Sequence, residues 1–216
     1  MTRVLSIVIA TTNVGKLTEL RALLGDFPVQ LLAVTDVLAE NLAIKEDGET
    51  FEANATLKAR AVCQATGLYA LADDSGLEVD ALGGRPGVRS ARFAHERATD
   101  AENNAALLRE LEDVPDPGRA ARFRCVLALA TPWAPAHVET VLGSCDGFIA
   151  RVPRGSGGFG YDPLFVVPEL AGRVMAELGE AEKNSVSHRA RAVRALRPVL
   201  VRLLDERLRE VERALG

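Results

Sequence analysis

The sequence predicts an α/β protein with a mixed β-sheet flanked by helices. In the first third of the chain, apolar strands alternate with segments whose apolar residues recur at helical spacing, which favours strands joined by helices. Two long stretches of alternating apolarity, 121–131 and 137–149, then follow each other closely, as in a hairpin. Strands joined by helices pair in parallel and hairpin strands pair antiparallel, so a sheet that contains both is mixed. We expect one domain over residues 1–216.

The first half of the chain divides into short elements. Residues 4–10 are predicted to form a buried strand, 15–24 a helix and 29–34 a second strand, with an acidic loop over 35–49. Thr50 can cap a helix that runs to about residue 66, where Gly67 ends it. A strand over 69–73 runs into the pair Asp73 and Asp74, and a short strand over 77–79 follows.

The second half begins with a glycine-rich loop over 83–87. A helix starts at Thr99 or Asp100 and runs to about residue 111, and the prolines after it stop it. The hairpin strands follow, then a second glycine-rich loop over 155–160. Beyond residue 170 the chain turns helical, and an apolar face from Val193 to Leu215 marks a C-terminal helix that Pro198 should kink or divide.

Composition excludes several classes of protein. The net charge of −4 argues against a nucleic-acid partner, and the arginines of the C-terminal helix alternate with acids, as on a solvated face. No apolar run reaches the roughly 18 residues of a membrane span, so we expect no membrane partner. Cys63, Cys125 and Cys145 form no C-x-x-C pair, which argues against a zinc site and fits a reducing cytoplasm.

The two adjacent aspartates are the most informative feature. Two acids at the end of a buried strand repel each other and lose hydration, and a divalent cation would relieve both costs. Oxygen ligands suit Mg²⁺, which in an α/β protein indicates phosphate chemistry. The alternative is that Asp-Asp-Ser-Gly over 73–76 is only a turn.

A candidate phosphate site lies between the first strand and the first helix. Thr11, Thr12, Asn13, Val14, Gly15 and Lys16 offer hydroxyls, a glycine and a lysine at a helix start, where free N–H groups favour anions. A Walker A loop would need glycine at Ala10 and serine or threonine at Leu17. The alternative is an ordinary helix start with a solvated lysine.

Three further segments carry polar residues suited to chemistry. Glu46 could add a metal ligand to Asp74, although acids before a helix commonly serve only its dipole. The loop over 155–163 can present Phe159 and Tyr161 to a base, or be a plain hairpin loop. Positive charge at His188 and Arg189, in the first turn of a helix that Ser187 can cap, is unfavourable for the helix dipole and indicates an anion or carbonyl partner.

Taken together, six segments resemble the inosine triphosphate pyrophosphatase family, the house-cleaning dITP/XTP pyrophosphatases. They are T-T-N-V-G-K at 11–16, G-x-T-F-x-x-N-A-x-x-K-A at 48–59, A-D-D-S-G-L at 72–77, G-G-x-P-G-V-x-S-A-R-F at 83–93, G-x-G-G-F-G-Y-D-P-x-F at 155–165 and E-K-N-S-V-S-H-R at 182–189. Each motif is unspecific by itself. All six, in order over nearly the whole chain, are specific.

The resemblance implies a long mixed sheet with two lobes and an active site in the cleft between them. It implies Mg²⁺-dependent hydrolysis of inosine and xanthosine triphosphates (ITP, dITP, XTP) to the monophosphate and pyrophosphate by a homodimer. Asp74 would be general base and metal ligand, and Glu46 a second metal ligand. The residues implied to bind the triphosphate are Thr11 to Lys16, Lys58 and Ser75, and those implied to bind base and ribose are Phe159, Gly160, Tyr161, Asp162, Lys183, His188 and Arg189.

This chain departs from the family pattern at two positions. Relatives commonly carry glutamate where this chain has Ala53, and here the acid stands one residue earlier as Glu52. Some relatives have tryptophan in place of Tyr161, an exchange that should preserve stacking. Two other functions stay open: a pyrophosphatase for other modified bases, and a nucleotide sensor without turnover.

Overall fold

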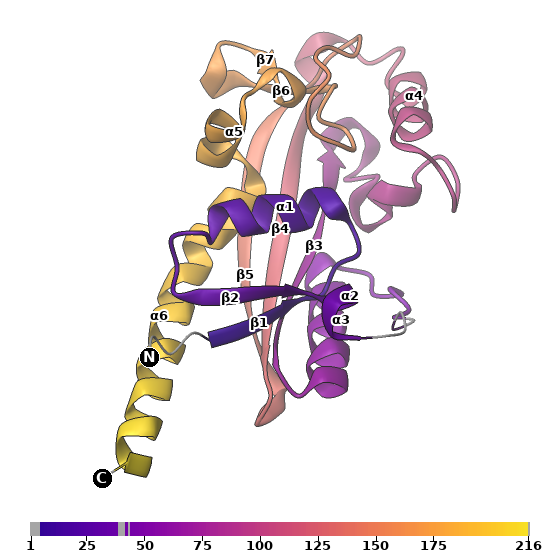
Figure 1. The fold of residues 1–216 in the computed structure, drawn as a ribbon. Helices are drawn as coiled ribbons and strands as arrows, with labels where there is room; N and C mark the ends of the chain where they lie inside the picture. The colour runs from indigo at the N-terminus through magenta and orange to yellow at the C-terminus, as the bar shows by residue number, and fades with distance from the viewer. Residues whose placement is uncertain (1–4, 39–41, 43, 216) are drawn as a thin grey trace.

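The computed structural model describes residues 5–38, 42 and 44–215, which form a β-sheet with helices on both faces (Figure 1). Val4, where we expect the first strand to begin, lies outside the described residues. The strands are β1 Leu5–Ile9, β2 Val29–Ala33, β3 Tyr69–Val79, β4 Ala120–Thr131, β5 Ala134–Ile149, β6 Phe165–Val167 and β7 Arg173–Val174. The α-helices are α1 Val14–Leu23, α2 Val34–Val37, α3 Phe51–Thr66, α4 Asp100–Glu110, α5 Glu180–Val186 and α6 His188–Leu215.

The seven strands have the order β2-β1-β3-β4-β5-β6-β7. β1 runs parallel to β2 and β3, whereas every pair from β3 to β7 is antiparallel. The predicted mixed sheet and the β4–β5 hairpin are therefore confirmed. β5 begins three residues earlier than expected, at Ala134.

Three predicted helix boundaries are confirmed in atomic detail. The Thr50 hydroxyl accepts a hydrogen bond from the Ala53 amide at 3.1 Å, which caps α3, and Gly67 ends that helix with a φ of +66°. Thr99 and Glu102 form a reciprocal capping box at the start of α4.

Three expectations about individual segments were wrong. Asp73 to Gly76 form no turn, because β3 continues through them and pairs with β4 in unbroken register, Asp73 opposite Leu127. The acidic loop begins later than expected, since α2 occupies Val34–Val37. Pro198 does not divide α6: it lies on the exposed face, where water can satisfy the carbonyl that the missing N–H leaves free.

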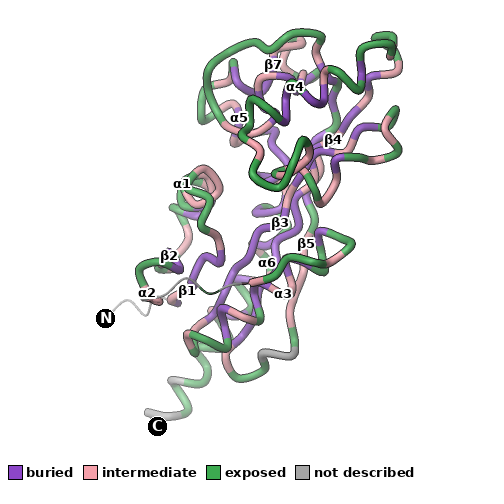
Figure 2. Tube along the Cα trace, turned by 90° about the vertical axis from the view of Figure 1, so that its right-hand side faces the viewer, coloured by how far each residue is buried: buried purple, intermediate pink, exposed green. Residues whose placement is uncertain are grey.

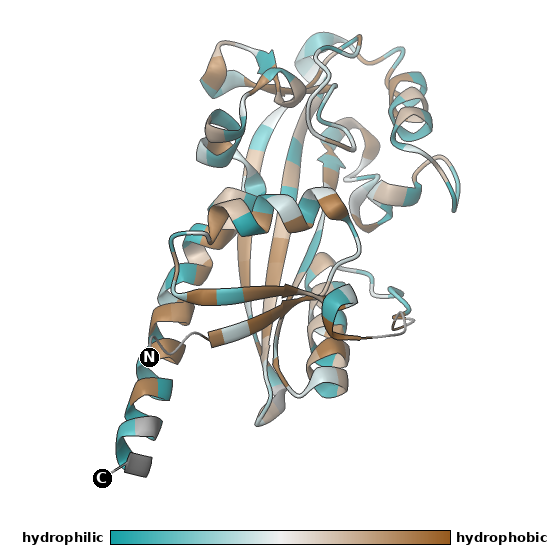
Figure 3. Ribbon diagram, viewed as in Figure 1, coloured by the Kyte–Doolittle hydropathy of each residue, from teal (hydrophilic) through white to brown (hydrophobic). Residues whose placement is uncertain are grey.

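The long strands β3, β4 and β5 contribute to three separate hydrophobic cores. At one end, α1 and α6 cover one face of the sheet and α3 covers the other, so alternate residues of β3 enter different cores: Tyr69 and Leu71 the first, Ala70 and Ala72 the second. At the other end, α4, β6 and the β4–β5 hairpin base enclose a third core. The buried residues lie mainly along the long strands (Figure 2), and the hydrophobic residues are concentrated on the same strands (Figure 3).

The functional cleft opens where the sheet becomes incomplete. β1 pairs with β3 only as far as Leu71, so the edge of β3 beyond that residue has no β1 partner. A cavity of about 410 Å³ lies there, between the β1–α1 loop and the 155–162 loop of the other lobe. The expected two-lobed fold with a cleft between the lobes is thus observed. No helix among the described residues is long and apolar enough to cross a membrane.

Candidate active site

The cleft brings together predicted site residues from six separated parts of the chain. The predicted site residues that line it are Thr11, Thr12, Asn13, Lys16, Glu46, Lys58, Asp74, Ser75, Phe159, Gly160, Tyr161, Asp162, Lys183, His188 and Arg189. Two predicted residues are not part of the lining. The Val14 side chain is exposed, and Gly15 packs beneath the Phe159 ring.

The β1–α1 loop presents the N-terminus of α1 to the cleft. The Asn13 side chain accepts a hydrogen bond from the Lys16 amide at 3.0 Å, and the Thr11 hydroxyl accepts from the Asn13 amide at 3.2 Å. A Cβ atom on Gly15 would lie 2.6 Å from a Phe159 ring carbon, so this position needs glycine for the two lobes to meet. The remaining N–H groups of this helix end can bind an anion.

Asp73 lies on the α1 and α6 side of the sheet and neutralises two cations. Its two oxygens lie 2.7 Å from Lys16 Nζ and 2.7 Å from Arg189 Nε, and the Ser75 hydroxyl donates to it at 2.8 Å. Burial raises the pKa of Asp73, but the charges of Arg189 and Lys16 outweigh it and hold the pKa well below its ordinary value. Asp73 is therefore a buried anion at neutral pH.

Asp74 lies on the opposite, α3 side of the sheet. Lys58 Nζ lies 2.8 Å from Asp74 Oδ1 and 2.7 Å from Glu46 Oε2, and it also donates to the Asp73 carbonyl at 3.0 Å. Burial raises the pKa of Asp74, and Lys58 only partly offsets it. Burial also raises the pKa of Glu46, but there the charge of Lys58 prevails and the pKa is lowered. One ammonium group thus joins two carboxylates at the cleft wall.

These two carboxylates are the candidate metal ligands. Within the described part of the chain, no group of three or more His, Cys, Asp or Glu side chains could hold a metal ion. Glu46 and Asp74 alone would leave most of a coordination sphere to other oxygens. That donor set fits Mg²⁺, which commonly takes one or two carboxylates and completes its shell with water and substrate phosphates.

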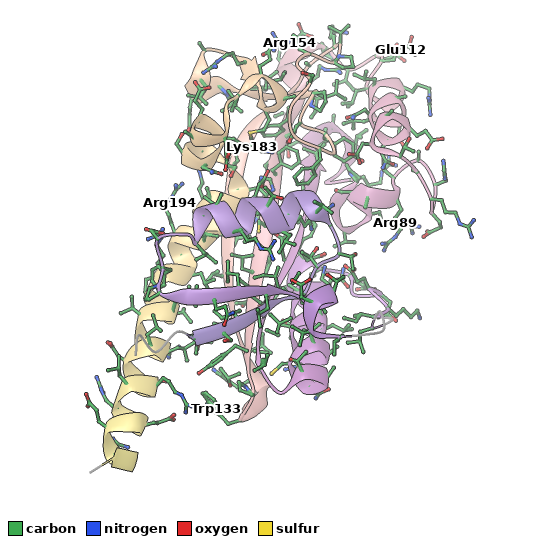
Figure 4. The ribbon with its side chains drawn as sticks, viewed as in Figure 1. Arg89, Glu112, Trp133, Arg154, Lys183 and Arg194 are labelled. Atoms are coloured by element: carbon green, nitrogen blue, oxygen red, sulfur yellow. The ribbon has the colours of Figure 1, made fainter. Side chains whose placement is uncertain are left out.

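A second ion-pair cluster fixes the opposite end of the cleft. Lys183 Nζ lies 2.7 Å from Asp162 and 2.6 Å from Glu19, and Glu19 also pairs with Arg189. Asp162 in turn accepts a hydrogen bond from the Phe159 amide at 3.0 Å. Lys183 lies between the lobes above α1 (Figure 4), with its Nζ 5.0 Å from the centre of the Phe159 ring. The glycine-rich loop is therefore tied to α1 through charged side chains.

Helix α4 holds the same loop from the other side. Asp100 accepts a hydrogen bond from the Gly160 amide at 2.7 Å, and Asn104 donates to the Gly160 carbonyl at 2.9 Å. Tyr161 is almost fully buried, and its hydroxyl donates to the Ser90 carbonyl at 2.8 Å. These contacts fix Phe159 and Tyr161 at the cleft.

His188 is buried as a neutral ring. It stacks on Phe123 with ring centroids 4.7 Å apart, and its Nδ1 has no hydrogen-bond partner among the described residues. Burial, reinforced by the charge of Arg189, holds the pKa of His188 well below its ordinary value. The neutral ring can therefore donate one hydrogen bond to a polar ligand and accept another.

Sequence reasoning missed four residues that organise the site. Asp73 was recognised as an acid, but its partners were not, because they come from distant helices. Glu19 lies three residues after Lys16, so the two side chains share one helix face. This spacing could have indicated that Glu19 also faces the site. Asp100 and Asn104, four apart on α4, give the same kind of signal. Glu52, at the departure from the family pattern, lies outside the cleft lining and accepts a hydrogen bond from Thr140.

Known proteins resemble this chain over most of its length. The model of the Ham1 family matches residues 7–199. The dITP/XTP pyrophosphatase of Geobacillus kaustophilus is 52% identical over 190 residues, 88% of this chain and 91% of the relative. That of Thermus thermophilus is 52% identical over 196 residues, 91% of this chain and 92% of the relative.

A solved structure matches the fold. The HAM1 protein from Coxiella burnetii superposes with a TM-score of 0.82 at 44% sequence identity, covering 92% of this chain and 99% of that one. The family match, the close relatives and the shared fold together show that the chain belongs to the Ham1 family.

Proposed function

We propose that the chain hydrolyses deaminated purine nucleoside triphosphates (ITP, dITP and XTP) to the nucleoside monophosphate and pyrophosphate. This reaction removes bases that would otherwise be misincorporated into DNA or RNA. One observation carries the proposal: a single cleft joins an anion-binding helix end, a carboxylate pair bridged by Lys58, and a ring-and-cation cluster at Phe159 and Lys183. The curated relatives named dITP/XTP pyrophosphatase support the same activity.

Asp74 is the proposed general base. Burial raises its pKa, which makes its carboxylate a better proton acceptor than that of an ordinary aspartate. It would take a proton from a water that attacks the α-phosphorus, and the bond between the α-phosphorus and its bridging oxygen would break. The electron pair leaves with pyrophosphate. Lys16 and Lys58 would stabilise the charge that develops on the phosphoryl oxygens.

Mg²⁺ is the proposed cofactor, held by Glu46 and Asp74. When bound, it would neutralise phosphate charge and favour departure of pyrophosphate. The Lys58 ammonium donates hydrogen bonds to three acceptors: the carboxylates of Glu46 and Asp74 and the Asp73 carbonyl. These bonds orient the two carboxylates before a metal ion binds. The N-terminal segment of α1 and Ser75 would hold the phosphates beside them.

The base would bind at the other end of the cleft, between Phe159 and Tyr161. A 6-oxo purine offers an acceptor where adenine offers an amino donor, and Arg189 has only donors. Three of its nitrogens already donate to Asp73, Glu19 and Ser75, which leaves two of five N–H groups for a base. Asp162, Lys183, Gly160 and His188 would complete this end. A site built on such hydrogen bonds rejects a mismatched base strongly.

We further propose that the protein acts in the cytoplasm as a homodimer. The three cysteines are free and buried, as expected in a reducing compartment. Light scattering combined with size-exclusion chromatography would test the dimer, since a monomer and a dimer differ twofold in mass.

Product analysis tests the function. The protein is incubated with Mg²⁺ and, separately, with the triphosphates of inosine, xanthosine, adenosine and guanosine, and the products are separated by ion exchange. We expect monophosphate and pyrophosphate from the inosine and xanthosine nucleotides alone. Preferred turnover of other modified bases would favour a pyrophosphatase of different specificity, and tight binding without turnover would favour a sensor.

A further inference from the structure

Five described residues bring positive charge to the cleft, and their partners distinguish one of them. They are Lys16, Lys58, Arg92, Lys183 and Arg189. Four of the five have a carboxylate oxygen within 2.8 Å. The exception is Arg92, whose Nε lies 3.9 Å from the carboxylate of Glu96.

The Arg92–Glu96 contact is weak for physical reasons. Glu96 is largely exposed, and its other oxygen is held at 2.9 Å by Arg89. An exposed pair at 3.9 Å gains little Coulomb energy in water. Arg92 therefore retains N–H donors and most of its charge for a ligand that enters the cleft, whereas the charge of each other cation is already held in a short ion pair.

Contacts place the Arg92 guanidinium at the carboxylate end of the cleft. Arg92 is the last residue of the 3-10 helix Gly87–Arg92, which packs against β3. Its Nη2 lies 3.5 Å from the Glu46 carbonyl, and the Glu46 side chain joins Asp74 through Lys58. Arg92 therefore lies beside Glu46, one of the two candidate metal ligands.

We propose that Arg92 binds the terminal phosphates of the substrate, the part that leaves as pyrophosphate. A planar guanidinium donates two parallel hydrogen bonds to phosphate oxygens, and such charge-assisted bonds are the strong ones. A triphosphate is strongly negative, and the other four cations of the cleft are already neutralised by carboxylates. Arg92 supplies a weakly paired positive charge where the leaving pyrophosphate accumulates negative charge. This inference rests on the proposed pyrophosphate-releasing reaction.

Product inhibition separates this role from binding of the base or the nucleoside. Wild type, Arg92→Ala and Arg92→Lys are assayed with ITP and Mg²⁺, and inhibition by pyrophosphate and by inosine monophosphate is measured for each. We expect Arg92→Ala to raise the pyrophosphate inhibition constant and the ITP KM by roughly tenfold or more, with unchanged inhibition by the monophosphate. Arg92→Lys should recover part of the loss, because it restores the charge without the planar fork.

Arg97→Ala is the matched control, since it removes the same charge from an exposed position in the same segment. Arg89, on the outer surface of the 3-10 helix (Figure 4), is avoided because its loss would free Glu96 to pair with Arg92. Pyrophosphate inhibition that is equal in Arg92→Ala and Arg97→Ala would overturn the inference, and so would an equal loss of monophosphate inhibition. If wild type fails to hydrolyse ITP, the proposed function fails, and calorimetric titration of magnesium pyrophosphate into wild type and Arg92→Ala still decides the role of Arg92.

Discussion

Asp73 and Asp74 are consecutive residues of β3, yet their carboxylates lie on opposite faces of the sheet. The two acids therefore have different partners: Asp73 contacts Lys16 and Arg189 from α1 and α6, and Asp74 contacts Lys58 from α3. Because side chains alternate along a strand, the two adjacent positions reach two different sets of partners in one site. Asp73 organises the cations, and Asp74 faces the candidate metal site.

The first prediction concerns Asp74 as the general base. Asp74→Asn should reduce kcat by roughly 10²- to 10⁴-fold, because the amide accepts no proton at neutral pH. Nucleotide binding should be largely retained, since the phosphate and base contacts come from other residues. Single-turnover kinetics and calorimetric binding of ITP measure the two effects separately. Near-normal hydrolysis would exclude Asp74 as the base.

The second prediction concerns Asp73 as a structural anion. Asp73→Asn should lower the free energy of unfolding by about 3 kcal/mol or more, because it leaves buried positive charge near Lys16 and Arg189 without its counter-ion. Urea unfolding measures the change. Asp116→Asn, which breaks the exposed pair with Arg151, is the control and should leave stability unchanged. Equal stabilities of the two variants would contradict the role of Asp73.

The third prediction concerns pH and His188. The pKa of this ring is held well below its ordinary value in the folded protein, so the unfolded chain binds a proton that the folded chain does not. Stability should therefore fall as pH falls below about 6.5, by at most about 1.4 kcal/mol per pH unit from this ring. Urea unfolding between pH 7.5 and pH 5 should show a steeper slope for wild type than for His188→Gln. Identical slopes would show that the ring is not kept neutral on folding.

The fourth prediction concerns base selection by Arg189. Arg189→Ala should lower the ratio of ITP to ATP turnover by roughly tenfold or more, because the donors that match a 6-oxo group are lost. Stability should also fall, since Asp73 and Glu19 lose a partner. Lys16→Ala is the control: it also breaks a pair with Asp73 but lies at the phosphate end, so it should slow both nucleotides alike. A ratio that falls equally in both variants would remove Arg189 from base recognition.

Local patterns predicted most of the fold. Apolar periodicity located the long helices and strands, and cap residues such as Thr50 and Gly67 fixed their ends. The interpretation of residues 73–76 as a strand end or turn failed because polar residue types favour turns only when no neighbouring strand satisfies their backbone. Here β4 supplies that partner, and the charges of Lys16, Arg189 and Lys58 stabilise the acids within the strand.

The candidate site was predicted as a set of residues but not as a network. Six motifs supplied most of the predicted residues that line the cleft, because each motif is local in the sequence. The contacts that position them, such as Glu19 with Lys183 and Asp73 with Arg189, join residues more than 100 positions apart. No local pattern encodes such pairs, and they follow only from the packing of α1, β3 and α6.

Hydrolysis of ITP in ¹⁸O-labelled water tests the central mechanism most directly. If the water that Asp74 activates attacks the α-phosphorus, mass spectrometry should find the label in inosine monophosphate and none in pyrophosphate. Label in pyrophosphate would mean attack at the β-phosphorus, and label in released orthophosphate would mean cleavage of the terminal phosphate. Either result would contradict the proposed roles of Asp74 and of the carboxylate pair.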